Sequence, residues 1–288
     1  MASSSEHSTR EHSYIIRGGD AGADRLEILG RVMWPGTQRL LDGIPLKPGA
    51  RCLDFGCGGG DVSVKLAGRL GEKGRIVGVD MDAAALDRAR ARTQEIPASV
   101  RFMQVDCEAY SPAEQYDLVY ARFLLSHLGD VKGVLGRLYR AVKPGGFIAV
   151  EDVNMAGHIC HPFSQAFSDY VDLYVSCAEA RGADPVIGPK LPAMILDAGF
   201  TDLEIDVQTP TFMRGEGKHI ARITMQNIAA TAIASGLIDQ PRVAAILNDL
   251  EALERDPRAV LSTAQVVQVR GRRPETDTQQ SEAPNGSA

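Results

Sequence analysis

The sequence lacks the features that mark membrane, secreted and nucleic-acid-binding proteins. No apolar run approaches the roughly 20 residues that cross a bilayer, and residues 1–7 lack the apolar core of a secretory signal. Lysine and arginine number 31 against 37 acidic residues, giving a net charge of −6, which argues against nucleic acid as the main partner. We therefore expect a cytoplasmic protein with no membrane and no nucleic acid among its partners.

Cysteine is also scarce, and its spacing excludes two further classes. There are five cysteines, an odd number, and no two form a C-x-x-C pair, so we expect reduced thiols rather than a disulfide framework. The segment His158-x-Cys160-His161 contains residue types that bind zinc. Further ligands at regular spacing are missing, however, and we expect no metal.

What the sequence does contain is a glycine-rich turn between an apolar run and a helical pattern. Residues 51–55 lead into Gly56, Gly58 and Gly60, and the helical pattern begins at Asp61. Strand, glycine turn and helix in this order let backbone approach a ligand closely and point unpaired N–H groups at it. The spacing is G-x-G-x-G, however, and dinucleotide-binding turns read G-x-G-x-x-G.

Acidic residues on both sides of the turn indicate which ligand suits it. Asp54 and Asp61 would repel a diphosphate and tolerate or attract a cation. With Asp54 the turn reads D-x-G-x-G-x-G, and at this point the sequence resembles the class I S-adenosylmethionine-dependent methyltransferases, whose cofactor carries an ammonium and a sulfonium but no phosphate. The resemblance implies S-adenosylmethionine as cofactor, with its methionine end held by the turn residues Asp54, Gly56, Cys57, Gly58 and Gly60.

Polar residues follow the ends of the next predicted strands as well. Asp80 ends the strand at residues 75–80, 20 residues beyond Gly60, where an acid commonly binds ribose hydroxyls. Because open α/β sheets bind ligands at their carboxyl ends, these residues should converge. The resemblance implies that further cofactor contacts come from Met81 after the second strand, Asp106 and Cys107 after the third, and Arg122 and Phe123 after the fourth.

The fold expected from this pattern is α/β: a Rossmann-like, seven-stranded, mostly parallel sheet with helices on both faces and a helical cap over the cofactor site. We expect disordered residues at 1–12 and 274–288. Between them we expect an N-terminal helical lid at 13–44, the cofactor-binding core at 45–153, and the rest of the core at 154–273 with cap insertions at about 154–185 and 215–256. The lid should contain two helices that meet near Pro35, and the last strand should span Val260–Val269. Tyr14 either faces the cofactor from the lid or packs on the core.

Methyl transfer is an in-line displacement at an activated carbon, so the protein mainly has to hold the acceptor near the methyl group. A general base is needed only where the acceptor must lose a proton, and the candidates by position are His127, His158 and His161, with Glu151 and Asp152 behind them. The insertions should enclose a small acceptor, of the kind met in secondary metabolism, rather than a polymer. The atom methylated (oxygen, nitrogen or carbon) stays open.

Two other functions fit the same residues. One is a cofactor-binding protein of this fold that does not methylate and has another catalytic or a regulatory role. The other is a nicotinamide-dependent oxidoreductase. The resembled enzymes that methylate exocyclic amino groups of bases carry an Asn/Asp-Pro-Pro-aromatic run after the fourth strand. Residues 120–123 here read Tyr-Ala-Arg-Phe, which argues against base methylation. The sequence leaves the oligomeric state open, a homodimer included.

Overall fold

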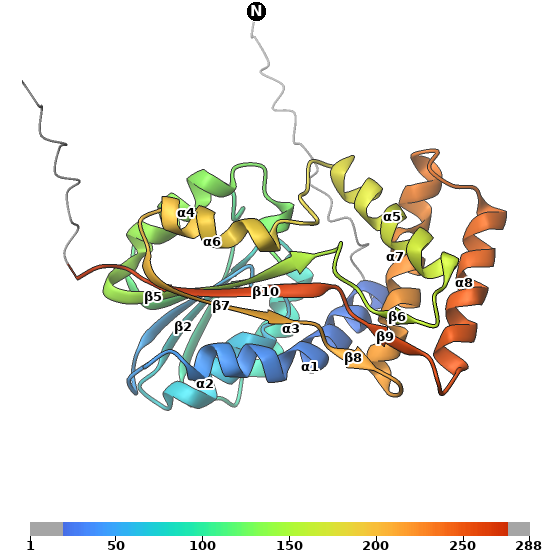
Figure 1. Cartoon of the computed structure of the whole chain (residues 1–288). Coiled ribbons are helices and arrows are strands. Elements are labelled where there is room, and N and C mark those ends of the chain that lie inside the picture. The colour runs from blue at the N-terminus through green and yellow to red at the C-terminus, as the bar shows by residue number, and fades with distance from the viewer. Residues whose placement is uncertain (1–19, 276–288) are drawn as a thin grey trace, which may run out of the picture.

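The computed structural model describes residues 20–275 and is built on one seven-stranded sheet (Figure 1). The strand order is β3-β2-β1-β4-β5-β10-β7. The first five strands run parallel, and β10 lies antiparallel between β5 and β7. This confirms the predicted mostly parallel α/β sheet. The strands are β1 (Arg51–Phe55), β2 (Arg75–Asp80), β3 (Ser99–Gln104), β4 (Tyr116–Arg122), β5 (Val142–Asn154), β7 (Thr201–Gln208) and β10 (Gln265–Arg272).

Helices cover both faces of this sheet, because side chains alternate along each strand. On one face, Cys52 of β1 packs with Leu66 of α2 (Asp61–Leu70). On the other, Leu53 packs with Leu135 of α4 (Val131–Ala141) and Ile195 of α6 (Leu191–Asp197). Helix α3 (Ala83–Thr93) lies on the α2 side (Figure 1). The alternation also directs the Asp54 side chain toward α2.

Three helices form a second cluster beside the carboxyl ends of the parallel strands (Figure 1). They are α5 (Gln165–Glu179), α7 (Ile220–Ala234) and α8 (Gln240–Arg255), and they correspond to the predicted insertions. A small sheet of β6 (Cys160–His161), β9 (Val260–Ser262) and β8 (Thr211–Phe212) adjoins them. No helix among residues 20–275 has the length and apolarity needed to cross a membrane.

The prediction of a single last strand at Val260–Val269 was wrong. The chain changes partners within it: β9 pairs with β6 and β8, whereas β10 pairs with β5 and β7 from Gln265 onward. Both halves are apolar and rich in β-branched residues, so the sequence pattern predicts one continuous strand. Alternation of apolar and polar side chains indicates which face of a strand is buried, but it does not indicate which strand pairs with it.

The prediction of two helices meeting near Pro35 was also wrong. Helix α1 (Asp20–Asp42) continues through Pro35. A proline inside a helix costs about 3 kcal/mol through a lost hydrogen bond and a steric clash. Burial of Met33, Leu40 and Leu41 in the core offsets that cost. The later part of α1 is therefore packed into the core. Residues 1–19 and 276–288, including Tyr14, lie outside the described residues.

Residues 143–146, which contain Pro144 and two glycines, lie inside β5, whose pairing with β4 shifts register between Tyr116 and Leu118. Gly145 has a φ of 74°, so the irregularity is a local distortion of the strand rather than a break before it. Of the tail predicted to be disordered, Glu275 is described and forms an ion pair with Arg272.

Candidate functional site

The glycine-rich turn lies at the carboxyl end of β1, and its three glycines do different things. All have positive φ: 79° at Gly56, 50° at Gly58 and 75° at Gly60. A methyl group added at Gly56 would meet Leu124, and one at Gly60 would meet Ala89. At Gly58 nothing lies within 4 Å of that position. Gly58 therefore presents bare backbone to open space, as a turn that holds a ligand requires.

Asp80 lies beside this open face. Its Oδ2 accepts the amide hydrogen of Gly58 at 2.8 Å, and its Oδ1 accepts that of Asp82 at 2.9 Å. Burial raises the pKa of the Asp80 carboxyl. A carboxylate has about four acceptor positions, so lone pairs remain for hydroxyl donors. Met81 follows, with 40% of its surface exposed, and its carbonyl accepts from Gln104 Nε2.

Asp54 lies beneath the turn rather than in front of it. It is buried, and its Oδ2 accepts a hydrogen bond from Ser63 Oγ of α2 at 2.6 Å. Burial is the main cause that raises the pKa of Asp54 to about 7, and the charges of Asp61 and Asp80 add to the effect. A cationic ligand above the turn would favour its ionised form.

Asp61, expected to attract a cationic ligand, already has a cation of the protein itself. Its Oδ2 accepts a hydrogen bond from Nη2 of Arg122 at 2.6 Å, and the Arg122 side chain is only 11% exposed. Arg122 also approaches Thr37 of α1, with 3.4 Å between Nη1 and Oγ1. The structure thus places Arg122 behind the site, where it joins β4, α2 and α1.

A buried carboxylate, Glu151, continues this network under α1. It accepts hydrogen bonds from Thr37 Oγ1 (3.1 Å), from the Tyr120 hydroxyl and from Gln268 Nε2. All four side chains are 1% exposed or less. The sequence placed Glu151 near the site but gave no sign of these partners, because they come from three other elements, α1, β4 and β10.

Phe123 has the strained backbone of the site. Its φ is 54°, uncommon for a residue other than glycine, and its amide donates to the carbonyl of Glu151. The ring packs with Leu29, Met33 and Ile220, which come from α1 and α7. Backbone strain of this kind costs about 1–3 kcal/mol and concentrates at functional sites. Phe123 thus links the end of β4 to the cap.

The remaining residues expected to contact the cofactor differ in exposure. Asp106 is exposed, and its Oδ1 accepts the Glu108 amide hydrogen at 2.8 Å. Cys57 and Cys107 are buried, and burial raises the pKa of both thiols, that of Cys107 to about 12. Both therefore stay protonated at neutral pH and do not act as nucleophiles.

The three candidate histidines are dispersed. Burial lowers the pKa of both His127 and His158 to about 4, so both are neutral at neutral pH. His127 follows the end of β4, and His158 Nδ1 lies 2.8 Å from the Met155 carbonyl oxygen. His161 is exposed in β6, where it pairs with Val260. The structure brings His127 to the strand ends but leaves His161 on the surface.

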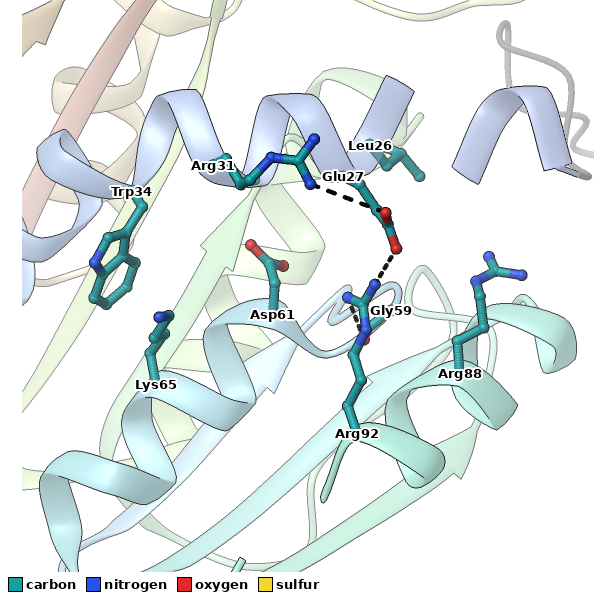
Figure 2. A pocket seen from close by; sticks show the side chains of 10 residues that line it. Leu26, Glu27, Arg31, Trp34, Gly59, Asp61, Lys65, Arg88 and Arg92 are labelled. Atoms are coloured by element: carbon teal, nitrogen blue, oxygen red, sulfur yellow. Dashed lines mark hydrogen bonds and ion pairs between the residues drawn. The ribbon is translucent and has the colours of Figure 1, made fainter. Parts of the chain in front are cut away.

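A groove of about 340 Å³ lies on the outer side of the turn, between α1 and the helices α2 and α3 (Figure 2). Glu27 of α1 bridges it by pairing with Arg92 of α3 and, at 4.0 Å, with Arg31. Arg92 also donates to the Gly59 carbonyl. These contacts fix α1 as a roof over the turn.

Sequence reasoning missed one polar cluster above the ends of β4 and β5. Nε of Arg25 donates to Thr224 Oγ1 at 2.8 Å, so α1 and α7 meet there. Tyr170 and Tyr174 of α5 both interact with the charge of Arg25. Helical spacing in α5 was visible in the sequence and suggests core packing. Only the three-dimensional structure shows that Arg25 lies beside these tyrosines.

The chain shares its central part with known enzymes. A family model described as a methyltransferase domain matches residues 52–146. The trans-aconitate 2-methyltransferase of Deinococcus radiodurans is 34% identical over 158 residues, which are 54% of this chain and 59% of that protein. The 2-phytyl-1,4-naphtoquinone methyltransferase of Thermosynechococcus vestitus is 32% identical over 139 residues, or 48% of this chain and 59% of that protein.

A solved structure shares the fold over more of the chain. Phosphoethanolamine N-methyltransferase 2 of Haemonchus contortus, in complex with phosphomonomethylethanolamine and S-adenosylhomocysteine, has a TM-score of 0.55 at 21% identity. The match covers 87% of this chain and 57% of that one. Each match spans less than two thirds of these proteins' own length.

Proposed function

We propose that this chain, whose residues 52–146 belong to the class I S-adenosylmethionine-dependent methyltransferases, transfers a methyl group from S-adenosylmethionine to an oxygen, nitrogen or carbon atom of a small molecule. One observation carries the proposal. The open face of Gly58 lies directly beside the carboxylate of Asp80, with 2.8 Å between the Gly58 nitrogen and Oδ2. A nucleoside needs both features: bare backbone for close approach and an acceptor for its ribose hydroxyls.

The residues around this point fit the cofactor. Asp80 keeps lone pairs for the ribose diol after accepting two amide hydrogens. The exposed Met81 and Asp106 follow β2 and β3, where they would meet the nucleobase. The raised pKa of Asp54 indicates a carboxyl whose ionised form a cationic ligand would stabilise.

The cap determines where the acceptor binds. If the ribose lies at the end of β2 and the methionine part at β1, the methyl group points toward the ends of β4 and β5. Helices α1, α5 and α7 meet above those ends, at Arg25 and Thr224. Such an enclosure excludes water and suits a small acceptor.

Bound S-adenosylmethionine supplies an activated methyl carbon, so the protein's own residues have to orient the acceptor and keep water out. Of the candidate bases, His127 is the one that follows β4, at the carboxyl end of the sheet toward which the methyl group would point. Because its pKa is about 4, it is a weak proton acceptor. The arrangement therefore favours an acceptor atom that already carries a free lone pair.

Two measurements test the proposal. Calorimetric titration should show that S-adenosylhomocysteine binds and that NADH does not. Incubation with methyl-tritiated S-adenosylmethionine and a metabolite extract should then label a small molecule. Binding of NADH instead would contradict the assignment. Tight binding of S-adenosylhomocysteine without any labelled product would favour a non-methylating protein of the same fold.

A further inference from the structure

Arg25 of α1 lies among the cap helices. It is partly buried on the second turn of α1, and its Nε donates to the buried Thr224 Oγ1 of α7 at 2.8 Å. The buried Tyr170 and Tyr174 of α5 lie near enough to interact with its charge. The guanidinium thus sits where three helices of the cap meet.

Among the side chains that the structure describes, no carboxylate lies at ion-pair distance from Arg25. Other arginines near the site have such partners: Arg31 pairs with Glu216 at 2.6 Å, and Arg122 pairs with Asp61 at 2.6 Å. Burial lowers the pKa of Arg25, as expected for a charge that lacks a counter-ion. A buried charge without a partner is costly, so its presence needs a reason.

The buried Asp152 does not serve as that partner. Oδ2 of Asp152 accepts the Ser126 amide hydrogen at 3.1 Å, and its Oδ1 accepts that of Val153 at 2.8 Å. It contributes to the pKa of Tyr174 but not to that of Arg25. The negative charge of Asp152 is therefore directed at backbone below the enclosure.

A second unpaired donor lies on the same face of α7. Asn227 follows Thr224 by three residues, which places both side chains on one side of the helix. Asn227 is 5% exposed, and its Nδ2 has no hydrogen-bond partner. Thr224, which accepts from Arg25, and Asn227, whose Nδ2 has no acceptor among the described residues, thus lie within one turn of each other along α7.

The other groups near Arg25 determine the net charge of this part of the cap. Burial lowers the pKa of His127, and the charge of Arg25 lowers it further. With a pKa of about 4, His127 is neutral and adds no positive charge. The aromatic rings of His158, Phe167 and Tyr170 form an edge-to-face series, with centroids 5.6 and 5.7 Å apart. The enclosure therefore combines one positive charge with an aromatic wall.

Resting on the methyl transfer proposed above, we propose that the acceptor is a carboxylic acid whose carboxylate binds Arg25 and Asn227 while its apolar body packs on Phe167 and Tyr170. The planar guanidinium matches a carboxylate with two parallel hydrogen bonds. One positive charge balances a carboxylate, whereas a phosphate monoester carries about −1.5 to −2 at neutral pH and would remain undercompensated.

The first test needs no ligand. If Arg25 is kept for binding, replacing it by an apolar side chain should stabilise the ligand-free protein, because an uncompensated charge is removed. Arg25→Met should raise Tm by about 2–4 °C. The control is Arg69→Met, which removes a surface ion pair with Asp42 and should leave Tm nearly unchanged. A fall in Tm on Arg25→Met beyond that of the control would assign Arg25 a structural role and overturn the proposal.

The second test measures binding to the full chain with S-adenosylhomocysteine present. Benzoate and trans-cinnamate are the carboxylate probes, their amides are the uncharged counterparts, and phenyl phosphate is the dianion. Each carboxylate should bind the wild type at least about tenfold more tightly than its amide, and Arg25→Lys should remove that preference. Arg69→Met should retain it.

Carboxylates that bind no better than their amides, or an unchanged preference in Arg25→Lys, would overturn the proposal. So would tighter binding of phenyl phosphate than of benzoate. Titration of S-adenosylhomocysteine into the same samples separates this failure from failure of the proposed function. If the carboxylates bind through Arg25 but S-adenosylhomocysteine does not bind, the methyltransferase assignment fails while the anion site stands.

Discussion

Arg122 at the end of β4 and Asp61 at the start of α2 form an ion pair with 2.6 Å between Nη2 and Oδ2. The pair connects β4 with α2, the helix that follows the glycine turn. Arg122 also approaches Thr37, so α1 joins the same network. Two residues that resemble ligand contacts in the sequence therefore hold the site in shape from behind.

Removing the acidic partner should destabilise the fold more than it affects binding. Asp61→Asn leaves the largely buried Arg122 without its counter-ion, and we expect a loss of about 1–3 kcal/mol in the free energy of unfolding. Asp42→Asn removes an exposed pair with Arg69 and should cost under about 1 kcal/mol. Urea denaturation of both variants measures the difference. Equal losses would show that the Asp61 pair is no more than a surface contact.

Asp80 should determine affinity for the cofactor. In Asp80→Asn the carboxylate that would accept the ribose hydroxyls is lost, so binding of S-adenosylhomocysteine should weaken by about 1.5–3 kcal/mol, roughly 10- to 100-fold. The matched control is Asp87→Asn on α3, where the side chain is exposed and pairs only with Arg90. Calorimetric titration measures both, and an unchanged affinity in Asp80→Asn would remove this residue from the site.

Gly58 can be tested against a glycine with similar backbone strain elsewhere. Gly58 and Gly236 have φ values of 50° and 69°, and nothing lies within 4 Å of an added methyl group at either. Alanine at each position should cost about 1 kcal/mol of stability because of the positive φ. Only Gly58→Ala should also weaken S-adenosylhomocysteine binding, by about tenfold or more, because its methyl group would occupy the ligand's space. Equal affinities of the two variants would place the ligand elsewhere.

The contact between Thr37 and Glu151 should anchor α1 to the sheet. Thr37→Val keeps the shape of the side chain but leaves the fully buried Glu151 with one donor fewer, so we expect a loss of about 1–3 kcal/mol. Thr201→Val is the control, because Thr201 is exposed on β7 and should change stability by about 0.5 kcal/mol or less. A loss at Thr37 no larger than at Thr201 would contradict the anchoring role.

The sequence predicted the central fold well because its signals there are local. The turn from Asp54 to Gly60 and the acid Asp80 are close in the chain, and together they indicate which end of the sheet binds a nucleoside. The family predicted from that turn is confirmed over residues 52–146. The seven-stranded, mostly parallel sheet is confirmed as well, and helices follow β1, β2 and β4, as the alternating sequence pattern indicates.

What the sequence could not predict depends on contacts between distant segments. Pro35 indicates a helix end by local rules, yet burial on both sides of it carries α1 through. Arg25 and Thr224 are 199 residues apart, and no periodicity in either segment indicates the other. The proposed acceptor site depends on such pairs, and for this reason the sequence indicates the cofactor more clearly than the acceptor.

Stability should depend on pH through Asp54. Burial raises its pKa from 3.8 to about 7, so between about pH 4 and pH 7 the folded protein holds a proton that the unfolded chain has lost. The contribution of Asp54 to the free energy of unfolding is therefore complete below about pH 4 and is lost as pH rises to about 7. Asp54→Asn should remove this dependence while still accepting from Ser63. Relative to wild type, the variant should become progressively more stable between about pH 4 and pH 7, as measured by urea denaturation.

Comparing the variant with wild type at each pH isolates Asp54 from the other buried groups. Asp152, whose pKa burial raises to about 6, changes stability in the same direction, whereas His127 and His158, with pKa values lowered to about 4, destabilise the fold as pH falls below about 6.5. These effects are present in both proteins and cancel in the difference. A difference that stays constant across this range would show that Asp54 is ionised in the folded protein. Asp54 would then already be ionised without a ligand, whereas we expect a cationic cofactor to be needed to stabilise its ionised form.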